Sequence, residues 1–369
     1  MNLKHEALAI LARSLLRAAT HGPATKAVHP PASIAIVNLT TNIGDMICTT
    51  PLMRAVKVAY PSARVIVVGI AKNADILQGN PDIDEYLVYD YADFNGTLRR
   101  LRALAPAAGV ALNPSPHEIG LLYLSGAKII SAFRNPAFTG RAFQTLSKLV
   151  VTVPYEVGKY VPREYLKLLE PLGIHSSDTT KHLAVNPAVI AALRDALPPH
   201  PIITVAAGAG QNYKQWPPER FAAVAAHAAR TCGAALALIG GPNDRKAGEA
   251  FMASVAPAKV FDGLGQSIEE LKALISLSSL LIANDSGPVY IAEAFGVPTL
   301  VIAGVADPVE HPPRSAKNRV IDSPARTITL HSLVSDHDQV DEAAARRQME
   351  AITVERVIKE FDDLTKVIF

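Results

Sequence analysis

Cysteine, long apolar runs and net charge are all scarce in this chain, and each shortage excludes a class of protein. Only Cys48 and Cys232 occur among the 369 residues, one in each half. Two cysteines form neither a disulfide framework nor a zinc-thiolate set, and they are typical of a reducing compartment. No apolar run reaches the roughly 18 residues that a membrane-spanning helix needs. The formal net charge is +2, so no global electric field predicts a nucleic-acid partner.

The residues that are present describe a folded α/β protein. With 49% hydrophobic and 19% charged residues the chain is not a disordered one, and its length allows two domains. Apolar runs alternate with helical patterns, which predicts doubly wound parallel sheets covered on both faces. The expected strands are 34–37, 65–68, 85–89, 110–112 and 129–132 in the first half, and 202–206, 235–239, 259–262, 279–283 and 299–303 in the second.

These strands predict a domain over residues 33–180 and a second over 181–350. Residues 1–32 form a helical extension that either packs on the body of the protein, frays from it, or lies as a basic amphipathic helix on an anionic membrane. A polar stretch, 335–347, predicts a loop. Residues 351–369 predict a final amphipathic helix.

A Gly-Asp pair at a strand-to-helix turn is the first candidate site. It follows the strand 34–37, and ligands bind at the carboxyl ends of strands in open α/β sheets. Gly44 has no Cβ, so it allows a tight turn with positive φ. Asp45 is expected at the start of the helix, where its carboxylate serves either as a general base or as a helix cap. The residues alone leave both roles open.

Two loops in the second half have the composition of diphosphate-binding turns. Gly208 follows a strand and leads to Lys214, so backbone N–H groups and a positive charge occur together. Asp285, Ser286 and Gly287 precede a helix whose N-terminus is suited to phosphate oxygens. The alternatives are an ordinary loop with a solvated lysine and an Asx cap. Three such turns in two domains favour a nucleotide-diphosphate ligand in an interdomain cleft.

A nicotinamide-dependent enzyme is the main rival, and its glycine motif is missing. Such an enzyme needs Gly-x-Gly-x-x-Gly after its first strand, but residues 40–45 lack that pattern, and Gly208-Ala209-Gly210 is followed by Tyr213 in place of the third glycine. The sequence also has no Walker lysine–serine pair, no His-Glu-x-x-His motif and no acidic cluster suited to a metal. We therefore expect neither a cofactor nor a metal.

With these motifs in this order, the chain resembles glycosyltransferase family 9, the lipopolysaccharide heptosyltransferase family. The resemblance spans roughly residues 34–366, and the order and spacing of its signatures make it specific. The signatures are Asn42-Ile43-Gly44-Asp45 with Tyr60-Pro61-Ser62-Ala63, Gly208 to Lys214 with Trp216-Pro217-Pro218-Glu219-Arg220-Phe221, Gly240-Gly241-Pro242-Asn243-Asp244, and Asn284-Asp285-Ser286-Gly287-Pro288.

The resemblance implies the GT-B architecture, in which two Rossmann-like domains surround a cleft and the last helix returns to the first domain. It implies an inverting, metal-independent glycosyltransferase that moves a sugar from a nucleotide-sugar donor, by default heptose from ADP-heptose. The implied acceptor is a lipopolysaccharide core or a related bacterial surface saccharide or glycolipid. The implied location is cytoplasmic, with peripheral contact to the inner membrane as an option.

Residue by residue, the resemblance assigns roles to the candidate sites. Asp45 matches the position of the catalytic base, Lys214 matches the residue that contacts the donor phosphates, and Asp244 lies near an acidic position that contacts the donor ribose. The expected donor-binding residues are Gly44, Gly208, Lys214, Asp244, Asp285, Ser286, Gly287 and Tyr290.

Tyr290 departs from the family pattern, which usually has a histidine five positions after the motif aspartate. Tyrosine donates a hydrogen bond but carries no positive charge near neutral pH, whereas an imidazole can carry one. Two alternatives therefore stay open. One is a catalytically decayed sugar-nucleotide-binding module of the same fold, and the other is another GT-B sugar-nucleotide enzyme, such as an epimerase.

Basic residues in the first half predict where the acceptor binds. The stretch 96–158 contains seven lysines and arginines but only two acidic residues. We expect Arg99, Arg100 and Arg134 to attract an anionic acceptor, and the alternative is a solvated basic face.

Overall fold

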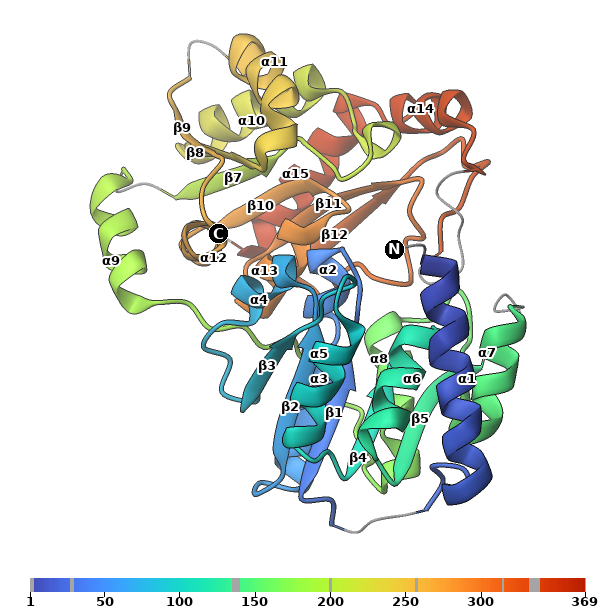
Figure 1. Cartoon of the computed structure of the whole chain (residues 1–369). Helices are drawn as coiled ribbons and strands as arrows, with labels where there is room; N and C mark the ends of the chain where they lie inside the picture. Colours follow the sequence, from blue (N-terminus) through green and yellow to red (C-terminus); the bar gives the residue numbers. More distant parts are fainter. Residues whose placement is uncertain are drawn as a thin grey trace. The chain divides into compact units, whose positions relative to one another are not determined.

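The computed structural model of this chain divides into two compact units, Met1–His182 and Leu183–Phe369. It describes residues 3–26, 30–113, 115–134, 140–198, 201–255, 258–313, 315–331 and 339–368. Each unit contains one parallel six-stranded sheet, so the expected α/β class is confirmed (Figure 1).

The first sheet has the strand order β3-β2-β1-β4-β5-β6. The chain reverses its direction of winding at β1, which pairs with both β2 and β4, and such a switch point is where open sheets bind ligands. The strands are β1 (Ser33–Val37), β2 (Arg64–Gly69), β3 (Glu85–Val88), β4 (Ala108–Ala111), β5 (Ile129–Arg134) and β6 (Val151–Pro154). The helices are α1 (Leu3–His21), α2 (Ile43–Ile47), α3 (Thr50–Ala59), α4 (Ala74–Leu77), α5 (Phe94–Ala103), α6 (Pro116–Ser125), α7 (Arg141–Leu146) and α8 (Val161–Lys167).

The second sheet has the order β12-β11-β10-β7-β8-β9, with its switch point between β7 and β10. The strands are β7 (Ile202–Ala206), β8 (Ala235–Gly240), β9 (Val260–Leu264), β10 (Leu280–Asn284), β11 (Thr299–Gly304) and β12 (Asn318–Asp322). The helices are α9 (Pro187–Ala196), α10 (Pro218–Cys232), α11 (Arg245–Val255), α12 (Ile268–Ser276), α13 (Gly287–Ala294), α14 (Glu342–Glu350) and α15 (Val354–Ile368).

Most of the expected strands lie inside the sheets, where both of their faces are covered, and two of them, β3 and β9, are edge strands. Strands β1, β7 and β10 are buried at every residue, so each reads as a continuous apolar run. Two edge strands, β6 and β12, were missed. Both are only partly buried. β12 carries polar and charged residues, whereas β6 continues the apolar run Leu149-Val150-Val151, which was not assigned to a strand.

Helix α1 is part of the first unit and packs beside α6 and α7 (Figure 1). Ile10 is buried against Gly120 of α6, where an added Cβ would lie 2.2 Å from Ile10 Cγ2. A glycine at that point lets the two helices approach closely. The N-terminal extension therefore packs on the body of the protein, although Leu8 and Leu16 on α1 stay exposed.

Helix α15 packs on α10 and β12 within the second unit, where Val357, Phe361 and Leu364 join the core, and its implied return to the first domain stays a prediction. The stretch 335–347 was expected to be a loop, but α14 begins inside it at Glu342, and residues 335–338 lie outside the described residues. The polar sequence of α14 is stabilised by Asp341, whose side chain accepts a cap bond from Ala344 N.

Among the described residues, every helix is too short or too polar to cross a lipid bilayer.

Candidate functional site

Asp45 lies in the first turn of α2, directly beyond the carboxyl end of β1, and is half-buried. Its Oδ2 accepts hydrogen bonds from Thr40 Oγ1 at 3.1 Å and Asn42 Nδ2 at 2.9 Å. The N-cap position belongs to Asn42, so the interpretation of Asp45 as the helix cap is wrong. The carboxylate is instead oriented by side chains of the preceding loop.

Gly44 does not make the turn. It is a buried helical residue of α2, and it is not among the positive-φ glycines, so the expected left-handed conformation is wrong. The turn is made earlier by side chains that bond to nearby backbone. Asn38 Oδ1 accepts from Thr40 N at 3.2 Å, and Thr40 Oγ1 accepts from Asn42 N at 3.1 Å. Such Asx and ST turns replace the need for glycine.

A fully buried carboxylate, Glu118 on α6, supports this edge of the first sheet. It accepts hydrogen bonds from Leu39 N at 2.9 Å and Asn113 N at 2.8 Å, so it ties the loops after β1 and β4 together. Burial raises the pKa of Glu118 to about 8, although these hydrogen bonds oppose the shift. The motif Ser115-x-x-Glu118 indicates a helix start, but nothing local in the sequence predicts this role.

In the second unit, Gly208 and Asp244 lie against each other. A Cβ on Gly208 would lie 2.0 Å from Asp244 Oδ1, so only glycine fits at this position. Asp244 Oδ2 accepts a hydrogen bond from Gly241 N at 2.8 Å. Burial raises the pKa of Asp244, and that hydrogen bond opposes the shift.

Asn284 joins two of the predicted loops and was missed as a site residue. Its Nδ2 donates to the carbonyl oxygens of Ala207 and Gly208, at 3.0 and 3.2 Å, and its Oδ1 accepts from Trp216 N at 3.0 Å. Asn284 is fully buried at the end of β10, next to the end of β7. It therefore holds the Gly208 loop beside the Asp285 turn.

Asp285, Ser286 and Gly287 make the turn from β10 into α13, and all three are half-buried. Ser286 is the N-cap residue of α13 but makes no capping hydrogen bond with its side chain, which donates to Asn284 O at 3.1 Å. Asp285 does not cap the helix either, so the Asx-cap alternative is wrong. Its Oδ1 accepts a short hydrogen bond from the Tyr290 hydroxyl group.

Tyr290 is 5% exposed, so its ring belongs to the packed interior. The ring lies edge-on to His311, with 5.8 Å between ring centroids. The hydroxyl group is directed to Asp285, so the contact of Tyr290 with the turn is through this aspartate.

Lys214 is the last residue of a short 3₁₀ turn, Asn212–Lys214, and is half-buried. The turn lies between the Gly208 loop and Trp216, which Asn284 binds. Lys214 therefore belongs to the loop that Asn284 positions.

The three predicted acceptor residues do not form one patch. Arg99 and Arg100 are exposed on α5, where Arg100 Nη2 donates to Val88 O at 3.0 Å at the end of β3. Arg134 is exposed at the end of β5. Three strands separate β3 from β5 in the sheet, a span of about 19 Å at ordinary strand spacing.

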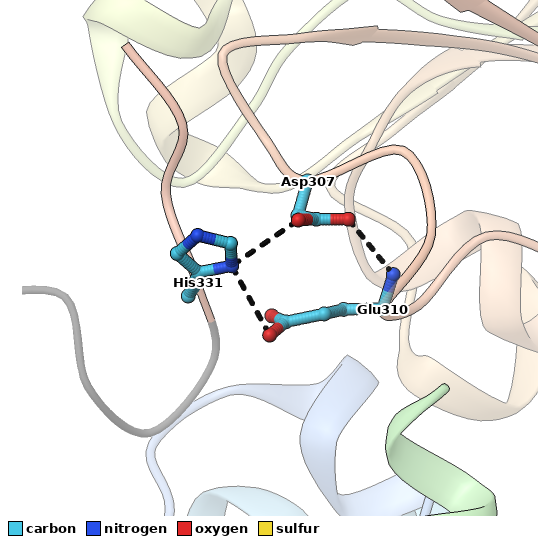
Figure 2. A group of neighbouring side chains, drawn as sticks. All are labelled: Asp307, Glu310 and His331. Carbon is cyan, nitrogen blue, oxygen red and sulfur yellow. Dashed lines mark hydrogen bonds and ion pairs between the residues drawn. The ribbon is translucent and has the colours of Figure 1, made fainter. Parts of the chain in front are cut away.

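One group of metal-ligand type was missed, which corrects the expectation that no suitable cluster exists. Asp307, Glu310 and His331 place one ligand atom each within 4.8 Å of one another (Figure 2). His331 Nδ1 lies 3.2 Å from Asp307 Oδ2 and 3.2 Å from Glu310 Oε1. Their spacing along the chain, Asp-x-x-Glu and a histidine 21 residues later, is too long to signal a site by itself.

The family model and the curated relatives agree on one family. The model of glycosyltransferase family 9 (heptosyltransferase) matches residues 142–333. Lipopolysaccharide heptosyltransferase 3 of Escherichia coli is 30% identical over 293 residues, which cover 72% of this chain and 81% of that protein. A family 9 glycosyl transferase from Veillonella parvula has a TM-score of 0.78 and 23% identity, over 93% of this chain and 100% of that one. The E. coli ADP-heptose lps heptosyltransferase II has a TM-score of 0.73 and 19% identity, over 91% and 99%.

Proposed function

The chain belongs to glycosyltransferase family 9, the heptosyltransferase family, and we propose that it transfers heptose from ADP-heptose to a lipopolysaccharide core saccharide or a related surface glycan. Its two parallel sheets are those of the GT-B fold. The donor is proposed because the similar E. coli heptosyltransferase II bears ADP-heptose in its name. The acceptor is proposed from the similarity to lipopolysaccharide heptosyltransferase 3.

The observation that best supports a nucleotide-sugar donor is the role of Asn284. Its side chain joins the Gly208 loop to the Asp285 turn, so two loops rich in backbone N–H groups occupy the same edge of the second sheet. The N-terminus of α13 adds the positive end of a helix dipole there. Backbone N–H groups at a helix N-terminus are well suited to a diphosphate.

Asp244 is the proposed partner of the donor ribose. Its carboxylate lies against Gly208 and is fixed by Gly241 N. A carboxylate held at a sheet edge can accept hydrogen bonds from ribose hydroxyl groups, as acidic residues do in other nucleotide-binding folds.

Asp45 is the proposed general base. Its carboxylate would take the proton of an acceptor hydroxyl group while that oxygen attacks the anomeric carbon, and the bond from that carbon to the diphosphate would break. Attack opposite the leaving group inverts the anomeric configuration. Thr40 and Asn42 support this role because they orient Oδ2 of the carboxylate.

The leaving diphosphate gains negative charge as its bond to the sugar breaks. We propose that Lys214 and the first-turn amides of α13 stabilise this charge. Positive groups of this kind can supply the stabilisation that a metal ion supplies in other transferases, and so we propose that the transfer step is metal-independent.

A transfer assay tests this function directly. Purified protein is incubated with ADP-heptose and a heptose-deficient lipopolysaccharide acceptor, and mass spectrometry follows the acceptor. We expect the acceptor to gain one heptose and ADP to be released. ADP-heptose that stabilises the protein but is never consumed would favour the decayed binding module. Conversion of the free sugar nucleotide without any acceptor would favour the epimerase.

The variant Lys214→Ala tests the donor phosphates separately. We expect it to weaken ADP binding by about 1.5–3 kcal/mol, the usual contribution of a hydrogen bond to a charged group, and to leave adenosine binding nearly unchanged. Isothermal titration with both ligands measures this difference. The control is Lys246→Ala, because Lys246 is exposed on α11. Lys272 would not serve, because it is fully buried. Equal losses for ADP and adenosine would place Lys214 away from the phosphates.

A further inference from the structure

We propose that Asp307, Glu310 and His331 form a binding site for a divalent transition-metal ion of the zinc type. The ion would join the loop after β11 to the segment after β12. The site lies within the second unit and is separate from the proposed transfer chemistry, which uses no metal. Imidazole nitrogen and carboxylate oxygens are a ligand set that zinc takes in proteins, with water completing the coordination.

Figure 2 shows the three side chains directed toward one another. Glu310 is 1% exposed, and the side chains of Asp307 and His331 are 11% and 29% exposed. The ligand oxygens of Asp307 and Glu310 lie within 4.8 Å of each other. Two carboxylates this close repel each other when both are ionised, and the repulsion is stronger away from water. A cation between them offsets that repulsion.

The distances suit shared ligands of one ion, and they lie at the long end of ordinary hydrogen-bond lengths. Charge-assisted N–H···O bonds are about 2.7–2.9 Å long, and the His227–Asp362 pair in the same unit has this length, 2.7 Å. His331 Nδ1 lies 3.2 Å from each of its two carboxylates. Ligand atoms about 2.1 Å from a common ion, at tetrahedral or octahedral angles, lie about 3.0–3.4 Å apart.

The backbone around the site is already held in place. Asp307 N donates to Leu330 O at 3.1 Å, and Leu330 N donates to Val305 O at 2.9 Å, so the two ligand-bearing segments are joined next to the site. Asp307 Oδ1 accepts from Val309 N at 2.7 Å and Glu310 N at 3.2 Å, which orients its other oxygen toward His331. Such supporting bonds are what position metal ligands in proteins.

The ion would stabilise a loop that supports the donor turn. The same loop carries His311, whose ring packs on Tyr290, and Tyr290 donates to Asp285. The proposed ion is therefore structural, and its binding is measurable without any sugar substrate.

The test uses the full chain after treatment with EDTA and dialysis. Zinc chloride is added, bound metal is counted by mass spectrometry, and thermal unfolding is followed with zinc or with magnesium. We expect one zinc ion per chain and a rise in Tm of about 5 °C at a hundredfold excess over Kd, with little effect of magnesium. His331→Gln should weaken zinc binding at least about tenfold.

Two variants make the test specific. His227→Gln changes a histidine that pairs with a single carboxylate, and it should bind zinc like the parent. Asp307→Asn keeps Oδ1 as the acceptor of two backbone hydrogen bonds, so the loop should keep its conformation while zinc binding weakens. This variant replaces His331→Gln in the test if His331→Gln does not fold. A parent protein that holds no zinc, or ligand variants that hold it as tightly as the parent, would overturn the proposal.

Discussion

At the scale of single residues, Asp45 has the position and surroundings of a base. Its helix does not need it as a cap, and two side chains from the preceding loop hold one of its oxygens. A carboxylate oriented in this way at a sheet switch point is a stronger candidate for chemistry than the sequence alone suggested.

We predict that Asp45→Asn lowers the transfer rate by about 10²–10⁴-fold and leaves Tm nearly unchanged. Asparagine still offers an oxygen to Thr40 and Asn42, but it cannot accept the acceptor's proton. Asp93→Asn is the matched control, since Asp93 caps α5 and asparagine caps equally well. Transfer at the parent rate by Asp45→Asn would exclude Asp45 as the base.

Tyr290 illustrates how burial changes an expectation. From the sequence, a histidine at this position would be expected to add a charged contact to the diphosphate. The side chain is buried, however, and its hydroxyl group donates to Asp285 of the donor turn.

We predict that Tyr290→His lowers stability by about 1–3 kcal/mol at both pH 6 and pH 8 and brings no gain in ADP affinity, because the smaller ring leaves a gap against His311. Thermal unfolding and ADP titration at the two pH values measure this. Tyr290→Phe keeps the ring and should preserve more of the packing. Tighter ADP binding by Tyr290→His at pH 6 alone would instead support a direct contact with the diphosphate.

At the scale of elements, buried side chains connect loops that the chain separates widely. Glu118 joins the loops after β1 and β4, and Asn284 joins the loops after β7 and β10. Each therefore acts at the switch point of its own sheet. Gly120 acts between helices instead, because it determines how closely α1 approaches α6.

We predict that Glu118 makes stability fall as pH rises. Burial raises its pKa from 4.5 to about 8 in the folded state, so between these values the folded chain holds a proton that the unfolded chain has lost. The stability linked to this proton is fully present below about pH 4.5 and is lost as pH rises through about 8, with a slope of up to about 1.4 kcal/mol per pH unit.

Urea unfolding of the parent and of Glu118→Gln across pH 5–8 measures this slope. The glutamine variant should be less stable at every pH, since its side-chain NH₂ group would face the backbone N–H donors that donate to Glu118. Its stability should change less with pH, because the contribution of Glu118 to the slope is lost. Identical slopes for both proteins would show that Glu118 is ionised in the folded state.

At the scale of the whole molecule, we predict that acceptor binding weakens as ionic strength rises. An anionic core saccharide is attracted by exposed arginines, and salt screens that attraction over about 10 Å at 0.1 M. Because the arginines are divided, Arg134→Gln and the double variant of Arg99 and Arg100 should be measured separately. The variant that removes the arginines in contact with the acceptor should lose acceptor affinity, and its acceptor binding should depend less on salt.

Arg194→Gln is the control for this prediction, because Arg194 is an exposed arginine of the second unit. If acceptor binding does not change with salt, and neither first-unit variant affects it, then these arginines are a solvated basic surface that does not bind the acceptor.

The sequence by itself determined the two parallel sheets and the position of the candidate turns. Apolar runs show where strands are covered on both faces, and glycine, aspartate and asparagine after those runs show where the chain turns, because both signals arise from residues close together in the chain. Edge strand β12 lacked this signal because it is mostly polar and only partly buried, and β6 was missed although its valines continue an apolar run.

Only the tertiary structure decided which distant groups meet. Asn284 bonds to residues 68 to 77 positions earlier, and His331 lies beside Glu310 although 21 residues separate them. The same holds for the burial of Glu118 and Tyr290 and for the packing of α15 on α10. Periodicity and turn chemistry record local preferences, whereas burial, pKa and ligand geometry depend on contacts that exist only after the sheets have formed.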